Sequence, residues 1–92
     1  MGKLKVKDIR YEEFKGRVCE IKFVEVYTMD RLVDWIEDLV DLHYKVIWSS
    51  AHRMYFENTI KRDDYVFVDC KQKIDLKDNR ILNYYQPVLL MF

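Results

Sequence analysis

The sequence has little glycine and proline, with two glycines and one proline among 92 residues. This scarcity argues against a long flexible linker and against a glycine-rich loop that holds phosphate groups. Disorder is not indicated either, because half of the residues are hydrophobic and 15% are aromatic, and disordered chains are poor in both types. We therefore predict that residues 1–92 form one compact domain, a usual size for a single hydrophobic core.

Long apolar segments are also missing. Lysines interrupt the first seven residues, so this segment lacks the apolar stretch of a secretory signal. The longest wholly apolar run covers residues 88–92, which is far too short to span a membrane. The sequence thus predicts a cytoplasmic protein without membrane association.

An excess of charge of either sign is absent, because 16 basic residues balance 16 acidic residues. Nucleic-acid-binding domains are typically basic, so the whole-chain charge does not indicate attraction to DNA or RNA. Strongly acidic mimicry of nucleic acid is not indicated either. Any partner must therefore be inferred from local patches.

Motifs for chemistry are scarce too. The two cysteines, Cys19 and Cys70, are too few for a disulfide framework, and we predict two buried thiols, or a bridge if their strands are neighbours. The two histidines, His43 and His52, form no zinc-ligand spacing with each other or with the cysteines. We predict no metal, no cofactor and no enzymatic activity, with a small enzyme as the least favoured alternative.

The clearest element is an amphipathic helix over residues 29–43. Apolar residues recur there at helical spacing: Met29, Leu32, Val33, Ile36, Leu39 and Val40. Thr28 is suited to cap the N-terminus, and Asp30 in the first turn favours the helix dipole. His43 is expected near the C-terminus, partly buried in a structural role.

Strand patterns surround this helix. We predict strands at residues 3–9, 17–27, 44–49, 65–70 and 80–86, with residues 10–16 as a connection. The strand at 17–27 has apolar residues on both faces, and a bulge near Phe23–Val24 would bring them to one core. The strand at 65–70 could continue through Leu76. Residues 51–60 fit either a hairpin with a strand at 53–57, which we favour, or a short helix from Ala51.

The predicted fold is α+β, with one amphipathic helix packed on a mostly antiparallel sheet in the order β-β-α-β-β-β-β. This arrangement is a two-layer sandwich. A single helix covers only part of one sheet face. The other face must therefore be polar, shielded by loops or covered by a partner.

Acidic residues gather on the face of the helix opposite its apolar stripe: Asp30, Asp34, Glu37, Asp38 and Asp41. Like charges at i,i+4 destabilise a helix by a few tenths of a kcal/mol, so helix stability alone does not account for them. One interpretation is a solvated face that keeps a neutral protein soluble. The other is a docking surface for a protein partner with a basic surface, whose binding would depend on salt.

Basic and aromatic residues alternate in residues 52–56 and 61–67, and such surfaces stack bases and contact phosphates. Arg53, Tyr55, Lys61 and Arg62 are therefore candidate residues for single-stranded RNA binding. Asp63 and Asp64, which follow directly, would repel phosphate. We keep nucleic-acid binding as the alternative function.

We predict a small non-catalytic protein-interaction module, acting as an adaptor or a stoichiometric inhibitor. Phages and other mobile elements use small domains of this kind against host defence, which is an analogy of size rather than of motif. The apolar C-terminal run, residues 88–92, is expected to be buried either in the domain's own core or in a homodimer interface.

Overall fold

The computed structural model describes the backbone of residues 6–89 and the side chains of residues 6–84. Its elements are β1 (Asp8–Phe14), β2 (Arg17–Val26), α1 (Met29–Asp41), β3 (Tyr44–Ser49), β4 (Arg53–Asn58), β5 (Asp64–Cys70) and α2 (Asn79–Leu89). The small α+β class and a mostly antiparallel sheet are confirmed. The predicted element order is wrong at its end, because the last element is a helix.

The first two strands form a hairpin with a two-residue turn. Lys15 has a φ of 56° and Gly16 a φ of 79°, and turns with positive φ at both positions match the twist of the strands they join. The strand predicted at residues 3–9 was placed too early, and the connection predicted at 10–16 is wrong for residues 10–14, which belong to β1. Residues 3–5 of that predicted strand lie outside the described residues.

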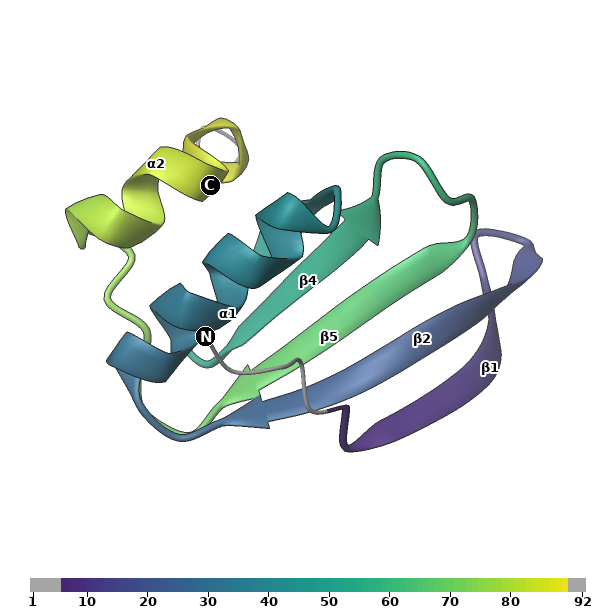
Figure 1. The fold of residues 1–92 in the computed structure, drawn as a ribbon, viewed down its shortest axis with the longest axis horizontal. Coiled ribbons are helices and arrows are strands. Elements are labelled where there is room, and N and C mark those ends of the chain that lie inside the picture. The colour runs from purple at the N-terminus through teal and green to yellow at the C-terminus, as the bar shows by residue number, and fades with distance from the viewer. Residues whose placement is uncertain (1–5, 90–92) are drawn as a thin grey trace.

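The five strands lie in the order β1-β2-β5-β4-β3, and Figure 1 shows β1, β2, β5 and β4 side by side in this order. The β2–β5 pair is parallel, whereas the three other neighbouring pairs are antiparallel. Chain direction explains the parallel pair, since α1 carries the chain from the end of β2 back across the sheet to the far edge, where β3 begins. One side of the sheet therefore carries α1 (Figure 1). We call it the helix side, and the opposite side the open face.

Helix α1 begins where the sequence indicates. The Thr28 side chain accepts a hydrogen bond from the Arg31 amide at 3.2 Å, which confirms the cap. The buried residues of α1 join strand residues in one core cluster: Leu32, Val33, Ile36 and Leu39 with Val24, Val26, Met54, Phe56, Val66 and Val68. The predicted end at His43 is wrong, because the chain turns into the left-handed region there, with a φ of 72°. His43 is consequently exposed rather than partly buried.

The bulge predicted at Phe23–Val24 is wrong. The registers of β2 with β1 and with β5 run through both residues without a break. Val24 therefore faces the helix side, while Phe23 faces the open face, as alternation in a regular strand requires. The irregularity in register lies instead in β3, between Val46 and Trp48.

The hairpin predicted for residues 51–60 is confirmed, because Arg53–Asn58 form β4. Strand β5 ends at Cys70 and does not continue to Leu76. The strand predicted at 80–86 is wrong, because these residues lie in α2. The Asp78 carboxylate accepts a hydrogen bond from the Arg80 amide at 2.8 Å, the contact that a helix-capping aspartate makes. The predicted burial of residues 88–92 concerns side chains outside the described ones.

Candidate functional site

A row of four aromatic side chains crosses the open face, one from each of four neighbouring strands. Trp48 of β3 lies opposite Tyr55 of β4, with ring centroids 4.8 Å apart. Tyr55 stacks on Phe67 of β5 with ring centroids 4.1 Å apart, and Phe67 and Phe23 of β2 form a T-shaped pair with centroids 5.4 Å apart. We call Trp48, Tyr55, Phe67 and Phe23 the aromatic row. Trp48 is 40% exposed and the other three are half-buried, so the row is accessible.

A smaller apolar cluster supports the row on the same face. Cys19, Ile21 and Tyr65 are buried there, and Phe14 packs edge-on against Tyr65 with centroids 5.0 Å apart. Antiparallel sheets with a solvated face usually show polar residues on it. The open face departs from that pattern, because it has an apolar centre although no described helix covers it.

Charged side chains of both signs surround the row. The Arg10 guanidinium lies 4.5 Å from the centre of the Phe23 ring, a cation–π contact, and pairs with Asp8 at 2.7 Å. Glu25 pairs with Lys7 and with Lys71, each at 2.9 Å. Apart from Lys71, these residues border a hollow of about 430 Å³, whose lining includes Phe23, Tyr55 and Phe67, three basic residues and four acidic ones. The rim is therefore close to electrically neutral.

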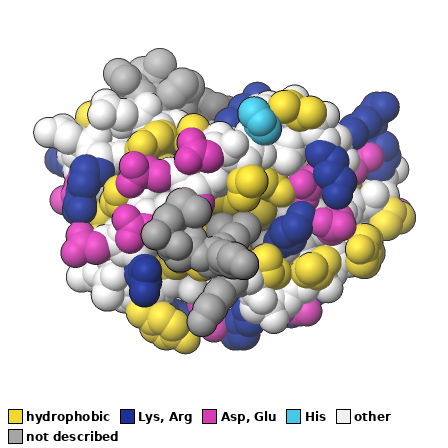
Figure 2. Space-filling view, in the orientation of Figure 1, with side chains coloured by type: hydrophobic (Ala, Val, Ile, Leu, Met, Phe, Trp, Pro, Cys, Tyr) yellow, Lys and Arg dark blue, Asp and Glu magenta, His cyan; other side chains and the backbone are white. Residues whose placement is uncertain are grey.

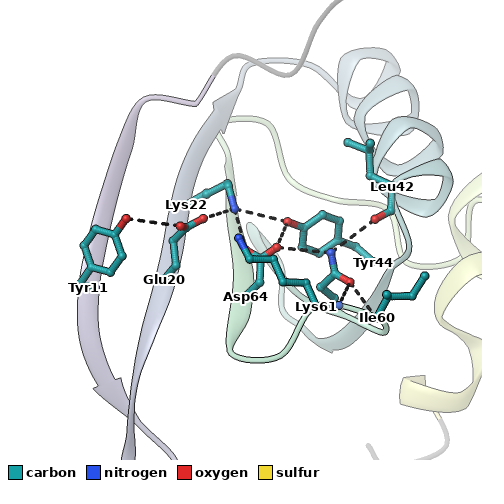
Figure 3. A network of polar contacts seen from close by, with 9 residues as sticks. Tyr11, Glu20, Lys22, Leu42, Tyr44, Ile60, Lys61 and Asp64 are labelled. Atoms are coloured by element: carbon teal, nitrogen blue, oxygen red, sulfur yellow. Dashed lines mark hydrogen bonds and ion pairs between the residues drawn. The ribbon is translucent and has the colours of Figure 1, made fainter.

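A buried polar network lies on the helix side, at the other end of the strands (Figure 3). Asp64 is 3% exposed and accepts hydrogen bonds from three side chains, those of Lys22 (2.7 Å), Tyr44 and Asn58 (3.3 Å). Lys22 also bonds Glu20. The Asn58 side chain in turn accepts from the amides of Ile60 and Lys61, each at 2.8 Å. The network thus ties the β4–β5 connection to β2 and β3.

The charge states in this network follow from its contacts. Burial alone would lower the pKa of Lys22, but hydrogen bonds to Asp64 and Glu20 raise it above its ordinary value. Burial, followed by the hydrogen bond to Asp64, raises the pKa of Tyr44. The hydrogen bond from Lys22 lowers the pKa of Glu20. Lys22 and Glu20 are therefore charged and Tyr44 is neutral at pH 7, which fits a structural ion pair.

The predicted acidic residues do share one surface. Asp30, Asp34, Glu37 and Asp41 are exposed on α1 and Asp38 is half-buried, and acidic side chains are visible over the helices in Figure 2. Asp30 pairs with Arg80 of α2 at 3.0 Å. This face lies on the helix side, across the sheet from the aromatic row.

The four residues predicted for nucleic-acid binding do not come together as one site. Arg53 and Tyr55 begin β4 and border the hollow beside the row. Lys61 and Arg62 lie beyond the other end of β4, in its connection to β5. They border a different depression, together with Arg17 and Lys45.

The cysteines and histidines form no reactive group. Cys19 and Cys70 are free and buried in different clusters on opposite sides of the sheet, so the bridge considered above is not formed. Burial raises the pKa of Cys70 and disfavours its thiolate. The Nδ1 atom of His52 lies 3.1 Å from the carbonyl oxygen of Cys70. Within the described part of the chain, no cluster of His, Cys, Asp or Glu is suited to hold a metal ion.

Sequence reasoning missed three members of the row. Tyr55 was identified as a candidate, and Phe67 lies in the basic and aromatic segment 61–67 but was not singled out. The predicted bulge assigned Phe23 to the core, and Trp48 was placed in the strand at 44–49 without a role. A sequence signal for an apolar open face was nevertheless present in β2, where Ile21 and Phe23 occupy one face of the strand and Val24 and Val26 the other. A strand that is apolar on both faces is typical of one that is covered on both sides.

The chain matches no protein-family model, no curated protein and no solved structure. Across residues 6–89, neither helix has the length and apolar character to cross a membrane. Function is therefore inferred from the geometry of the surfaces described above.

Proposed function

We propose that the protein is a protein-interaction module whose principal binding surface is the aromatic row. The observation that supports this proposal is the position of four accessible aromatic side chains, in register across four strands, on a sheet face without a described cover. Aromatic side chains and arginine are enriched at protein interfaces and supply most of their binding energy. Arg10 and Arg53 flank the row in this way.

The charges around the row favour a protein over a nucleic acid. Asp8, Glu12, Glu25 and Asp69 border the hollow, and their carboxylates would repel a phosphate backbone. A protein partner with an apolar ridge and charges of both signs would match both the row and its neutral rim. A module that binds in this way acts as an adaptor or, where it blocks the partner's own site, as a stoichiometric inhibitor.

Replacing Tyr55 by alanine is expected to lower the affinity for the partner roughly 30-fold, or about 2 kcal/mol, as at an interface hot spot. Tyr55 contacts both Trp48 and Phe67, so its loss interrupts the row in the middle. The matched control is Tyr27→Ala, which removes an aromatic side chain that is 66% exposed and lies after the end of β2. Partners captured by the wild-type chain are compared quantitatively between the variants, and the affinity of each purified partner is then measured by calorimetry.

A captured protein supports the proposal only when Tyr55→Ala loses it and Tyr27→Ala retains it. If both variants retain every partner, the aromatic row is not the binding surface. A fluorescein-labelled single-stranded RNA of mixed sequence provides the second arm. Salt-dependent binding of this RNA that Tyr55→Ala abolishes would replace the protein proposal with the nucleic-acid alternative.

The acidic face of α1 remains a proposed second surface, for a partner with a basic patch. The exposed pair of Asp30 with Arg80 supports this proposal, because it is a carboxylate–guanidinium contact of the kind that a basic partner would make. The double variant Asp34→Lys with Asp38→Lys is expected to weaken such a partner roughly tenfold at low salt and less at high salt, because exposed charges are screened. The variant should retain the partners of the aromatic row, which lies across the sheet. If no captured partner depends on these two residues, the face only keeps the protein soluble.

A further inference from the structure

Strand β1 is an open edge of the sheet. In the described part of the chain β1 pairs only with β2, whereas the other edge strand, β3, packs against α2. An unpaired edge presents amide and carbonyl groups that can bind another strand. Six of the seven β1 residues are exposed, including Ile9 at 48% and Tyr11 at 69%.

The hydrogen bonds of β2 identify which groups of β1 are free to pair. The Glu20 amide donates to the Asp63 carbonyl, and the Lys71 amide donates to the Val26 carbonyl. The backbone N–H and C=O groups of even-numbered β2 residues therefore point toward β5. The backbone groups of odd-numbered β2 residues consequently point toward β1, because these groups alternate in direction along a strand. The partners of these odd-numbered residues are Asp8, Arg10 and Glu12. The backbone groups of Ile9, Tyr11 and Glu13 therefore face the open edge.

We infer that β1 binds β1 of a second copy, antiparallel and with Tyr11 on the twofold axis, so that the two sheets join into one. In this register Tyr11 of one copy is opposite Tyr11 of the other, and Ile9 of each copy is opposite Glu13 of the other. The backbone groups of these three residue pairs exchange hydrogen bonds across the twofold axis. Arg10 of each copy is then opposite Glu12 of the other. Each pair of opposite charges across an antiparallel interface is stabilising.

The charges select this register over its neighbours. A twofold axis at Arg10 would oppose two arginines and place Asp8 against Glu12, whereas an axis at Glu12 would oppose two glutamates. Both of these registers also bring fewer of the residues whose backbone groups face the open edge opposite each other. Glu12 makes no ion pair within the described residues, so its carboxylate is available to a second copy.

Cysteine cross-linking tests both the pairing and its register. Opposite residues of a hydrogen-bonded antiparallel pair have Cα atoms about 5.5 Å apart, within the range of a disulfide. Tyr11→Cys is therefore expected to give covalent dimers under mild oxidation. Glu13→Cys alone should not, because two copies of residue 13 would be offset by four residues, or about 13 Å along the strand at roughly 3.3 Å per residue. An equimolar mixture of Ile9→Cys and Glu13→Cys chains should cross-link, while Cys19 and Cys70 are each 1% exposed and remain unreactive.

A charge exchange tests the same contact without oxidation. Arg10→Glu or Glu12→Arg alone places like charges opposite each other and is expected to raise the dimer dissociation constant at least about tenfold. The double variant restores opposite charges and should return the constant to within about threefold of wild type. The masses are measured by light scattering after size exclusion, and circular dichroism verifies folding.

Three results would overturn the inference: a monomer mass for wild type at millimolar protein, self-cross-linking of Glu13→Cys as fast as that of Tyr11→Cys, or a double variant no better than either single one. No other protein is needed in these experiments. Their failure would leave the proposed role of the aromatic row untouched.

Discussion

Asp64→Ala is expected to lower the free energy of unfolding by about 3–5 kcal/mol, the cost of removing one partner from a buried ion pair. Lys22 would lose its contact with the buried carboxylate, and the Tyr44 hydroxyl and Asn58 amide would lose their common acceptor. For a domain of this size each kcal/mol corresponds to roughly 4–8 °C in Tm. Urea unfolding followed by circular dichroism measures the change directly.

The matched control is Asp69→Ala in the same strand. Asp69 pairs with Lys71 at 2.9 Å, but the two side chains are 39% and 44% exposed, and pairs of this kind contribute about 0–1 kcal/mol. The two substitutions remove the same side chain from β5 and differ in burial. Equal effects of the two would contradict a structural role for the Lys22–Asp64 network.

Phe56→Ala is expected to cost about 3–5 kcal/mol of stability, as a buried aromatic truncation does. Phe56 is 0% exposed and lies in the core between the sheet and α1. Its neighbour in β4, Tyr55, points to the open face, and Tyr55→Ala is expected to cost only about 1–2 kcal/mol from lost ring contacts. Chemical denaturation of both variants gives the comparison.

This pair of neighbours also tests whether the open face is a binding surface or a second core. If the aromatic row is accessible, Phe56→Ala should mainly lower the free energy of unfolding, and Tyr55→Ala should mainly lower the affinity for a partner. If Tyr55→Ala destabilises the isolated chain as much as Phe56→Ala, the open face is already buried within the protein. Its availability to a partner would then be refuted.

Local signals were sufficient for much of the fold. The helical spacing and the Thr28 cap predicted α1, and alternation with β-branched residues predicted β2, β3 and most of β5. The segment at residues 80–86 gave the opposite result, because it was predicted as a strand and lies in α2, directly after Asp78. Aspartate favours both turns and helix starts, and the aromatic residues after it fit a strand as well as a helix. Residues 80–86 of α2 were therefore predicted to form a strand.

The aromatic row was not predictable from any short window. Phe23 and Phe67 are direct neighbours in space, although α1, β3 and β4 separate them in sequence. Only the strand order brings them together, and strand order is a property of the whole chain. The acidic face of α1 was predictable, in contrast, because its residues are one or two helical turns apart.

The parallel pairing of β2 with β5 has a consequence for how the chain folds. The β1–β2 hairpin and the β3–β4–β5 meander are each built from consecutive strands, so each closes only short loops. The β2–β5 contact joins these two units across residues 27–63 and carries the largest loop-closure entropy in the sheet. We therefore expect sheet assembly to be limited by one non-local encounter, between two units whose internal contacts form first.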